Sequence, residues 1–214
     1  MKKEISIILP IHNERDSLPI MVRLLNASIK FTKEIILVYD TETDNALDIA
    51  KELSKEFDNV KLIHNNIARG VRYAVDVGVK NAKYDVVMIF AVDEIFPVIA
   101  IDKMLSHLIE KNLDFISGTR YSKGGVRLGG SFLGAIFSRV ANKLFTFFTN
   151  IPLTDCTTGI KMMKKNVWNS IKLDSKPVGW AYAFELTIKV YLNDYKIDEF
   201  PLKSVDRLFG GSST

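Results

Sequence analysis

Residues 84–97 read Tyr-Asp-Val-Val-Met-Ile-Phe-Ala-Val-Asp-Glu-Ile-Phe-Pro, an apolar run followed by two adjacent carboxylates and a proline. The apolar residues from Val86 to Phe90 follow one another without alternation, which is typical of a strand buried on both faces. Two adjacent carboxylates, Asp93 and Glu94, come soon after this strand. In an open α/β sheet, ligands bind beyond the carboxyl ends of the strands. The stretch therefore predicts a central strand that ends in a polar site.

The two carboxylates have two interpretations. They can hold a divalent cation, which in turn binds a diphosphate that bare carboxylates would repel. Alternatively, Asp93 or Glu94 only caps a helix that begins near Pro97, since Asp is a good N-cap and Pro suits a first turn. The stretch by itself does not separate these interpretations.

Length and composition limit the class of protein. A chain of 214 residues fits one domain with a sizeable core. The single cysteine, Cys156, excludes an internal disulfide and is compatible with a reducing compartment. The first residues lack the apolar region of a signal peptide, so we expect a cytoplasmic protein. The net charge of +4 favours anionic partners such as phosphates, nucleotides or acidic lipid headgroups.

Strand-like apolar runs alternate with amphipathic segments along most of the chain. This alternation, with short linkers, predicts right-handed βαβ units and a mostly parallel sheet flanked by helices. The predicted strands cover residues 5–9, 34–38, 60–63, 85–90, 113–117 and 196–200, and the predicted helices cover residues 16–29, 44–57, 70–82, 98–110, 131–149 and 183–192.

The regular pattern is interrupted at residues 118–130, which are rich in glycine and cations and predict an exposed, mobile loop. The helix predicted next, over residues 131–149, carries a wide apolar face interrupted by Arg139 and Lys143. Such a helix either packs on the sheet or lies in a membrane interface. Packing is the commoner fate of an amphipathic helix, so we expect it to cover the sheet.

Polar clusters follow four of the predicted strands, at residues 10–14, 39–44, 65–70 and 93–94. Because parallel strands end at the same edge of a sheet, these clusters predict one pocket for a nucleotide and its metal. There is no GxGxxG after the first strand and no GxxxxGK[ST] anywhere, which argues against a Rossmann dinucleotide site and a P-loop. A seryl hydrolase is disfavoured because GxSxG is missing.

Six blocks of the sequence resemble the motifs of a known family. They read Leu-Pro-Ile-His-Asn-Glu at 9–14, Val-Tyr-Asp-Thr-Glu-Thr-Asp at 38–44, Arg-Gly at 69–70, Gly-Thr-Arg-Tyr at 118–121, Asp-Cys-Thr-Thr-Gly at 155–159 and Val-Asp-Arg-Leu-Phe-Gly-Gly-Ser at 205–212. The corresponding motifs are P-x-Y-N-E, V-D-D-G-S-x-D, K-G, G-S-R-Y, D-x-T-S-G and D-R-x-x-G-x-S. Over nearly its whole length the chain resembles a family 2 glycosyltransferase of the GT-A fold. The branch it resembles includes dolichyl-phosphate mannosyltransferases and bacterial polyprenyl-phosphate sugar transferases.

This resemblance implies an α/β fold and a set of site residues. It implies a single domain over residues 1–214, with a nucleotide-sugar-binding half at 1–117 and an acceptor-side half at 118–214. Asp93 and Arg207 are the implied catalytic residues, and Asp93 would bind Mg²⁺ or Mn²⁺. The nucleotide-sugar-binding residues implied are Pro10, His12, Glu14, Asp40, Arg69, Gly70, Ala91, Val92, Asp93 and Arg207, and the acceptor-binding residues implied are Arg120, Arg127 and Ser138.

The sequence departs from the family pattern at three places. The metal motif D-x-D reads Ala91-Val92-Asp93, so only its second aspartate is present. Tyr39 replaces the first aspartate of the second block, and Gly134 takes the place of a second arginine that would bind an acceptor phosphate. A catalytically weakened nucleotide-sugar-binding protein or scaffold is therefore one alternative. A nucleotidyltransferase is another, because it uses the same sheet and metal-diphosphate chemistry.

The function expected from the resemblance is metal-dependent, inverting transfer of a sugar from a nucleotide-diphosphate sugar. The acceptor would be a polyprenyl phosphate or a cell-surface glycan precursor. A phosphate acceptor needs no general base, whereas a sugar hydroxyl would need one, for which Glu185 is a candidate. We expect a cytoplasmic protein, at the inner face of the membrane if it makes peripheral membrane contact, and no nucleic-acid partner.

Overall fold

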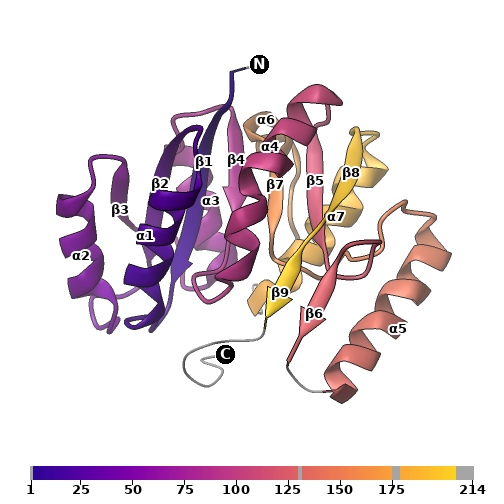
Figure 1. Ribbon diagram of the computed structural model, residues 1–214, viewed down its shortest axis with the longest axis horizontal. Helices are drawn as coiled ribbons and strands as arrows, with labels where there is room; N and C mark the ends of the chain where they lie inside the picture. The colour runs from indigo at the N-terminus through magenta and orange to yellow at the C-terminus, as the bar shows by residue number, and fades with distance from the viewer. Residues whose placement is uncertain (1, 130–131, 175–178, 206–214) are drawn as a thin grey trace.

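Within residues 2–129, 132–174 and 179–205, which the computed structural model describes, seven strands form one sheet in the order β3-β2-β1-β4-β7-β5-β8 (Figure 1). Strand β7 is antiparallel to both of its neighbours, whereas the other strand pairs are parallel. The sheet consists of β1 (Glu4–Ile11), β2 (Thr32–Tyr39), β3 (Val60–His64), β4 (Val86–Ile89), β5 (Phe115–Thr119), β7 (Lys161–Lys164) and β8 (Ile197–Pro201).

Helices cover both faces of this sheet and create two cores. One core lies under α1 (Ser17–Ser28), α2 (Leu47–Glu56), the short helix η1 (Phe96–Ala100) and α4 (Ile101–Glu110). The other lies under α3 (Val71–Asn81), α6 (Lys165–Ser170) and α7 (Tyr182–Leu192). The mostly parallel α/β sheet predicted from the sequence is confirmed.

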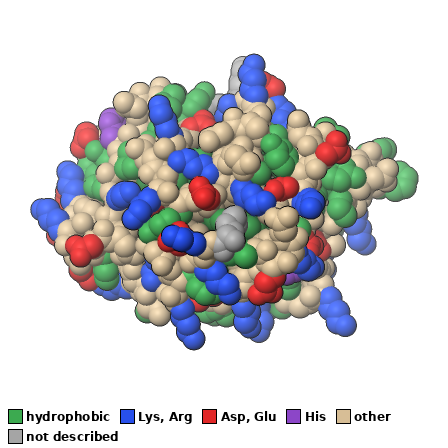
Figure 2. Space-filling view, turned by 90° about the horizontal axis from the view of Figure 1, so that it is seen from above, with side chains coloured by type: hydrophobic (Ala, Val, Ile, Leu, Met, Phe, Trp, Pro, Cys, Tyr) green, Lys and Arg blue, Asp and Glu red, His purple; other side chains and the backbone are tan. Residues whose placement is uncertain are grey.

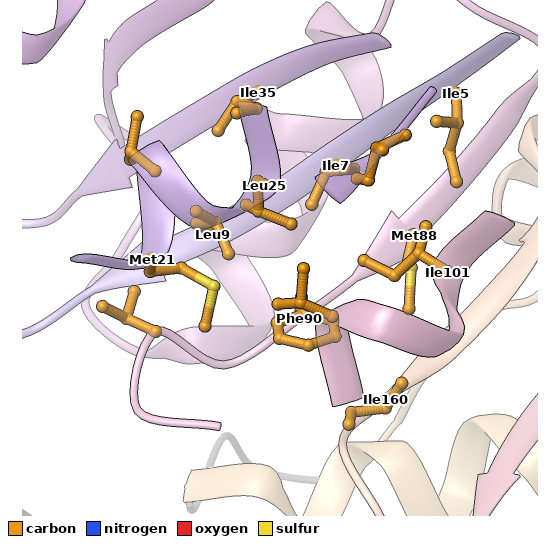
Figure 3. Packing of buried hydrophobic residues seen from close by; sticks show 14 of the residues in the cluster. Ile5, Ile7, Leu9, Met21, Leu25, Ile35, Met88, Phe90, Ile101 and Ile160 are labelled. Carbon is orange, nitrogen blue, oxygen red and sulfur yellow. The ribbon is translucent and has the colours of Figure 1, made fainter. Parts of the chain in front are cut away.

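Successive residues of the central strands are divided between the two cores, because side chains alternate across a sheet. Ile7 and Leu9 of β1 point into the first core beside Phe90, as Figure 3 shows, whereas Ile8 lies in the second. All four residues of β4 are fully buried. The continuous apolar run after Asp85 is thus explained by burial on both faces.

Part of the segment predicted as an exposed, mobile loop forms a strand, which corrects the prediction of a loop at those residues. Strand β6 (Val126–Leu128) pairs in parallel with β9 (Lys203–Val205). The N–H of Val126 donates to the carbonyl of Leu202 at 2.9 Å, and the N–H of Leu202 donates to the carbonyl of Thr119 at 2.8 Å. Gly125 lies so close to the Thr119 backbone that a Cβ added to it would come within 2.8 Å of the Thr119 carbonyl oxygen. Pairing with a strand more than seventy residues later fixes the segment.

The long helix α5 (Phe132–Thr149) does not lie on a face of the sheet, which corrects the expectation that it packs there (Figure 1). Its Phe145 ring lies 4.2 Å from the ring of Phe184 on α7, and its buried Asn142 accepts a hydrogen bond from the N–H of Cys156. The faces of the sheet are already covered by other helices, so α5 packs beside the β8 edge. Among the described helices, none is both long enough and apolar enough to span a bilayer.

Candidate functional site

A cavity of about 570 Å³, here called the larger cavity, opens at the carboxyl ends of β1, β2 and β4. The residues that the sequence predicts for nucleotide-sugar binding meet there, apart from Arg207, which lies outside the described residues. Those lining the cavity are Pro10, His12, Glu14, Asp40, Arg69, Gly70, Ala91, Val92 and Asp93. The fold therefore brings together residues from four separate polar clusters of the sequence.

The buried carboxylate of Asp44 shapes the wall that follows β1. It accepts hydrogen bonds from the N–H of Asn13, at 3.1 Å and 3.2 Å, and from the N–H of Ala46 at 2.8 Å. Asn13 has a φ of 58°, in the left-handed region that asparagine tolerates better than most residues. This clamp ties the end of β1 to the start of α2 and leaves His12 and Glu14 lining the cavity.

Asp40 holds the wall that follows β3. One carboxylate oxygen accepts the N–H of Gly70 at 2.7 Å, and the other accepts the side-chain amide of Asn65 at 2.7 Å. Gly70 has a φ of 124°, which side-chain-bearing residues rarely adopt. Asp40 thus positions the loop that brings Arg69 to the cavity, and its own role in nucleotide-sugar binding stays a prediction.

The carboxylates after β4 do not occupy the N-cap of the helix that follows. The N-cap of η1 is Ile95, which makes no side-chain capping hydrogen bond. Asp93 instead lines the larger cavity and a second one, which Glu94 also lines. Burial raises the pKa of Glu94 to about 7, with Arg120 opposing the shift and Asp93 adding to it. Neither carboxylate therefore takes the N-cap position expected in the capping interpretation, and both line cavities.

The second cavity, here called the smaller cavity, has a volume of about 220 Å³ and adjoins the larger one. Arg120 and Arg127, two of the three residues predicted to bind an acceptor, line it. Ser138 is not among the lining residues; its hydroxyl accepts a hydrogen bond from the Tyr121 hydroxyl at 2.9 Å. The cavity is lined by Ala91, Asp93, Glu94, Arg120, Arg127, Thr157, Thr158, Gly159, Trp180, Ser204 and Val205.

A buried ion pair forms one wall of the smaller cavity. The Arg120 guanidinium donates to both oxygens of Asp155, at 2.7 Å and 3.1 Å, and to the Thr157 hydroxyl at 3.0 Å. Burial alone would raise the pKa of Asp155, but the hydrogen bonds and charge of Arg120 outweigh it, so the pKa lies below its usual value. Arg120 therefore reaches the cavity with its charge largely balanced by Asp155.

Lys161, which is not predicted from the sequence, adds a positive charge behind this pair. Its side chain is fully buried on β7, where the ammonium donates to the Ser117 hydroxyl at 2.7 Å and to the Cys156 carbonyl at 3.3 Å. Burial lowers its pKa to about 8, against the favourable charge of Asp155. Its only sequence signal is a lysine in the strand-like run after the turn at 155–159.

Both cavities draw residues from both halves of the chain. Gly179 and Trp180 line the larger cavity, while Ala91, Asp93 and Glu94 line the smaller one. Trp180 lines both cavities and is not predicted from the sequence, because it lies outside the six motif blocks. Glu185, the candidate base for a hydroxyl acceptor, lines neither cavity and pairs with Lys189 at 2.8 Å.

The described residues can hold a metal ion only if a bound substrate supplies some of the coordinating atoms. Over the residues that the structure describes, no three His, Cys, Asp or Glu side chains group closely enough to hold an ion by themselves. Mg²⁺ commonly binds through one or two carboxylates together with substrate phosphates. Asp93, at the meeting point of the two cavities, fits that kind of site.

The chain belongs to glycosyl transferase family 2, whose family model matches residues 6–171. It is 29% identical over 191 residues to the dolichol-phosphate mannosyltransferase of Pyrococcus furiosus, covering 87% of this chain and 53% of that protein. It is 25% identical over 214 residues to the polyprenol monophosphomannose synthase of Mycolicibacterium smegmatis, covering 96% and 79%. The chain thus spans about half the length of the first relative and most of the second.

Solved structures show the same fold at low identity. The glucosyl-3-phosphoglycerate synthase of Mycobacterium tuberculosis, solved with Mn²⁺, UDP and glucosyl-3-phosphoglycerate, matches with a TM-score of 0.74 and 14% identity. The match covers 98% of this chain and 72% of that one. The same enzyme solved with Mg²⁺ and UDP also gives a TM-score of 0.74. The fold is the GT-A fold expected from the resemblance.

Proposed function

We propose that this chain is a glycosyltransferase that moves a sugar from a nucleoside diphosphate sugar to a polyprenyl phosphate. The observation that carries the proposal is the meeting of two cavities at Asp93. The larger cavity has the volume of a small-molecule site, and the smaller one offers two arginines to an anionic group. The names of the two curated relatives support a lipid-phosphate acceptor.

The larger cavity binds the donor in this proposal. Glu14 and Asp40 contact the base or ribose, Pro10 and His12 shape the cavity wall, and Arg69 assists at the diphosphate. Asp93 would hold Mg²⁺ or Mn²⁺, and the bound ion would supply positive charge to neutralise the departing diphosphate. Arg207, outside the described residues, would act on the same phosphates.

The smaller cavity binds the acceptor phosphate through Arg120 and Arg127. A phosphate oxygen is already ionised at neutral pH, so the reaction needs no general base. Holding this oxygen opposite the leaving diphosphate allows a single in-line displacement at the sugar carbon, which inverts its configuration. The protein therefore acts chiefly by positioning the two substrates and by stabilising charge.

Helix α5 is the part of the chain that meets the membrane in this proposal. Phe137 is 71% exposed, and Phe147 and Phe148 are each 77% exposed. Figure 2 shows apolar side chains at several places on one face, including the right-hand end of the molecule, the end at which Figure 1 places α5. Arg139 and Lys143 on the same helix would contact anionic headgroups, each contributing about 1 kcal/mol near the surface.

Ligand binding and turnover test the donor and acceptor assignments separately. The first assay is a thermal-shift panel of UDP, GDP and their hexose derivatives with and without Mn²⁺, because a ligand of the folded state raises stability. The second measures transfer to a polyprenyl phosphate and to a soluble saccharide, together with release of nucleoside diphosphate. We expect donor binding, nucleotide release and preference for the lipid phosphate.

Contrary outcomes identify the alternatives. Donor binding without nucleotide release would indicate a binding protein or scaffold. Turnover on a saccharide alone would move the acceptor to the glycan class and leave the donor site intact.

The membrane contact has its own test. Vesicles with anionic lipid should bind the protein weakly and release it at high salt. The double change Phe147→Ser and Phe148→Ser should abolish this binding, whereas Ile20→Ser, which alters an exposed apolar side chain on α1, should not. Binding that survives the double change would exclude α5 as the contact.

A further inference from the structure

Among the residues that the structure describes, three line both cavities: Ala91, Asp93 and Trp180. During transfer, the sugar carbon must lie between the leaving diphosphate on one side and the acceptor oxygen on the other. If the larger cavity holds the diphosphate and the smaller one holds the acceptor, the sugar ring lies where the cavities join. Of the three shared residues, Trp180 offers the large apolar surface.

The surroundings of Trp180 hold its indole in a defined orientation. The ring stacks on Tyr182, with centroids 6.0 Å apart and planes inclined by 29°. On another side it closely approaches Gly159, where a Cβ would come within 2.5 Å of the indole atom Cε3. Any side chain at position 159 would push the ring away. The glycine of the 155–159 turn therefore makes room for the indole.

The residues behind Trp180 are buried and packed against one another, which supports a positioning role for this stack. Tyr182 is fully buried at the start of α7, and its ring meets Trp168 edge to face with centroids 6.1 Å apart. Trp168 in turn donates its indole N–H to Asp76 at 3.0 Å. Trp180 is only partly buried, so it forms the solvent-accessible end of this aromatic series.

A hexose ring has an apolar face of C–H groups and a rim of hydroxyls. The C–H face packs favourably on an aromatic ring, because aromatic faces are apolar and carry partial negative charge. We propose that the Trp180 indole is the platform on which the transferred sugar lies, and that it contributes to selection of the donor sugar. This inference rests on the proposed function, since it needs a nucleoside diphosphate hexose in the larger cavity.

The affinity difference between a nucleoside diphosphate and its hexose derivative tests this platform. We would measure dissociation constants for UDP, UDP-glucose, GDP and GDP-mannose, with Mn²⁺ present, in wild type, Trp180→Phe and Trp180→Ala. In Trp180→Ala, affinity for the preferred nucleotide hexose should fall about tenfold, while affinity for the matching nucleoside diphosphate stays within about twofold. Trp180→Phe, which keeps an aromatic face, should recover most of the loss.

A matched control separates this contact from a purely structural role. Trp168→Phe alters the same aromatic series but lies outside both cavities, so it should leave the affinity ratio unchanged. Equal losses for nucleotide and nucleotide hexose in Trp180→Ala, or no loss for either, would overturn the platform. Binding of none of the four ligands to wild type would instead overturn the proposed function and this inference together.

Fluorescence provides a second measurement that does not depend on removing Trp180. The chain has two tryptophans, so Trp168→Phe leaves Trp180 as the single indole reporter. Addition of the preferred nucleotide hexose should change its emission by more than addition of the matching nucleoside diphosphate. Identical emission changes with the two ligands would contradict contact between the sugar and the indole.

Discussion

The larger and smaller cavities share Asp93 but are built in different ways. The wall residues of the larger cavity come mostly from the ends of parallel strands and are held by clamps between neighbouring strand–helix connections, such as that of Asp40 on Gly70. The smaller cavity depends on contacts outside the parallel strand ends: the Arg120–Asp155 pair and the pairing of β6 with β9. The first construction follows from the sheet, and the second needs the completed tertiary structure.

The two cavities also differ in how deeply the charged side chains beside them are buried. Behind the smaller cavity, Asp155 has no exposed side-chain surface and Lys161 is fully buried. At the larger cavity, Asp93 is only partly buried. Removing one member of a buried charge cluster is costly, because the remaining charges keep their desolvation penalty. Changes beside the smaller cavity should therefore affect stability, whereas Asp93 should affect chiefly turnover.

The largest effect on folding is expected for Asp155→Asn. This change leaves Arg120 and Lys161 without their shared carboxylate and should lower the free energy of unfolding by about 3–5 kcal/mol. Urea denaturation followed by circular dichroism measures it. Glu56→Gln is the control, because it removes an exposed pair with Arg23 and should cost less than about 1 kcal/mol. Equal losses of unfolding free energy in Asp155→Asn and Glu56→Gln would contradict the stabilising role of the buried charges beside the smaller cavity.

Asp93→Asn should give the opposite pattern. Losing the carboxylate at the junction should lower kcat/KM about 100- to 1,000-fold, because charge on the leaving diphosphate is then poorly neutralised. Its free energy of unfolding should change by less than about 1 kcal/mol, since the side chain is partly exposed. Asp48→Asn, at an exposed position on α2, is the activity control. Turnover at the wild-type rate would exclude Asp93 from the reaction.

The buried ammonium of Lys161 should leave a signature in the pH dependence of stability. Its pKa is about 8 in the folded protein and 10.5 in the reference state, so the unfolded chain binds more protons between these values. Stability conferred by this group therefore rises with pH over that interval, by at most about 1.4 kcal/mol per pH unit. The difference in unfolding free energy between wild type and Lys161→Met should follow this rise.

Denaturation of wild type and Lys161→Met from pH 7 to pH 10 measures the slope. Burial raises the pKa of the Cys156 thiol to about 11, which opposes the rise above pH 9, but the thiol is present in both proteins. Lys80→Met, at an exposed position on α3, is the matched control. Parallel curves for wild type and Lys161→Met would show that the buried lysine does not titrate in this range.

The smallest effect is expected for Ser138→Ala. The Ser138 hydroxyl bonds Tyr121 rather than lining the smaller cavity, so KM for a polyprenyl phosphate should change by less than about threefold. Tyr121→Phe removes the same hydrogen bond and should have a similar effect on stability, with the double change adding little. A large rise in KM for Ser138→Ala alone would restore this serine to the acceptor site.

The predictions from sequence succeeded where structure is local and failed where it depends on distant partners. The apolar runs identified the strands, and the clusters after them identified the larger cavity, because parallel strands deliver their ends to one edge. The prediction of a loop over residues 118–130 did not include β6, because the glycine content of this segment does not indicate pairing with β9. Helix α5 was misjudged because an apolar face does not reveal what covers it.

In the sequence by itself, six motif blocks determined the family and the residues around the larger cavity. The alternation of apolar and amphipathic segments determined the α/β sheet, because hydrophobic periodicity acts over a few neighbours along the chain. Only the tertiary structure decided that Asp155 neutralises Arg120, that Lys161 is buried behind them, and that Trp180 reaches both cavities. Burial and charge pairing join residues distant in the chain, and no local pattern encodes which partner each one meets.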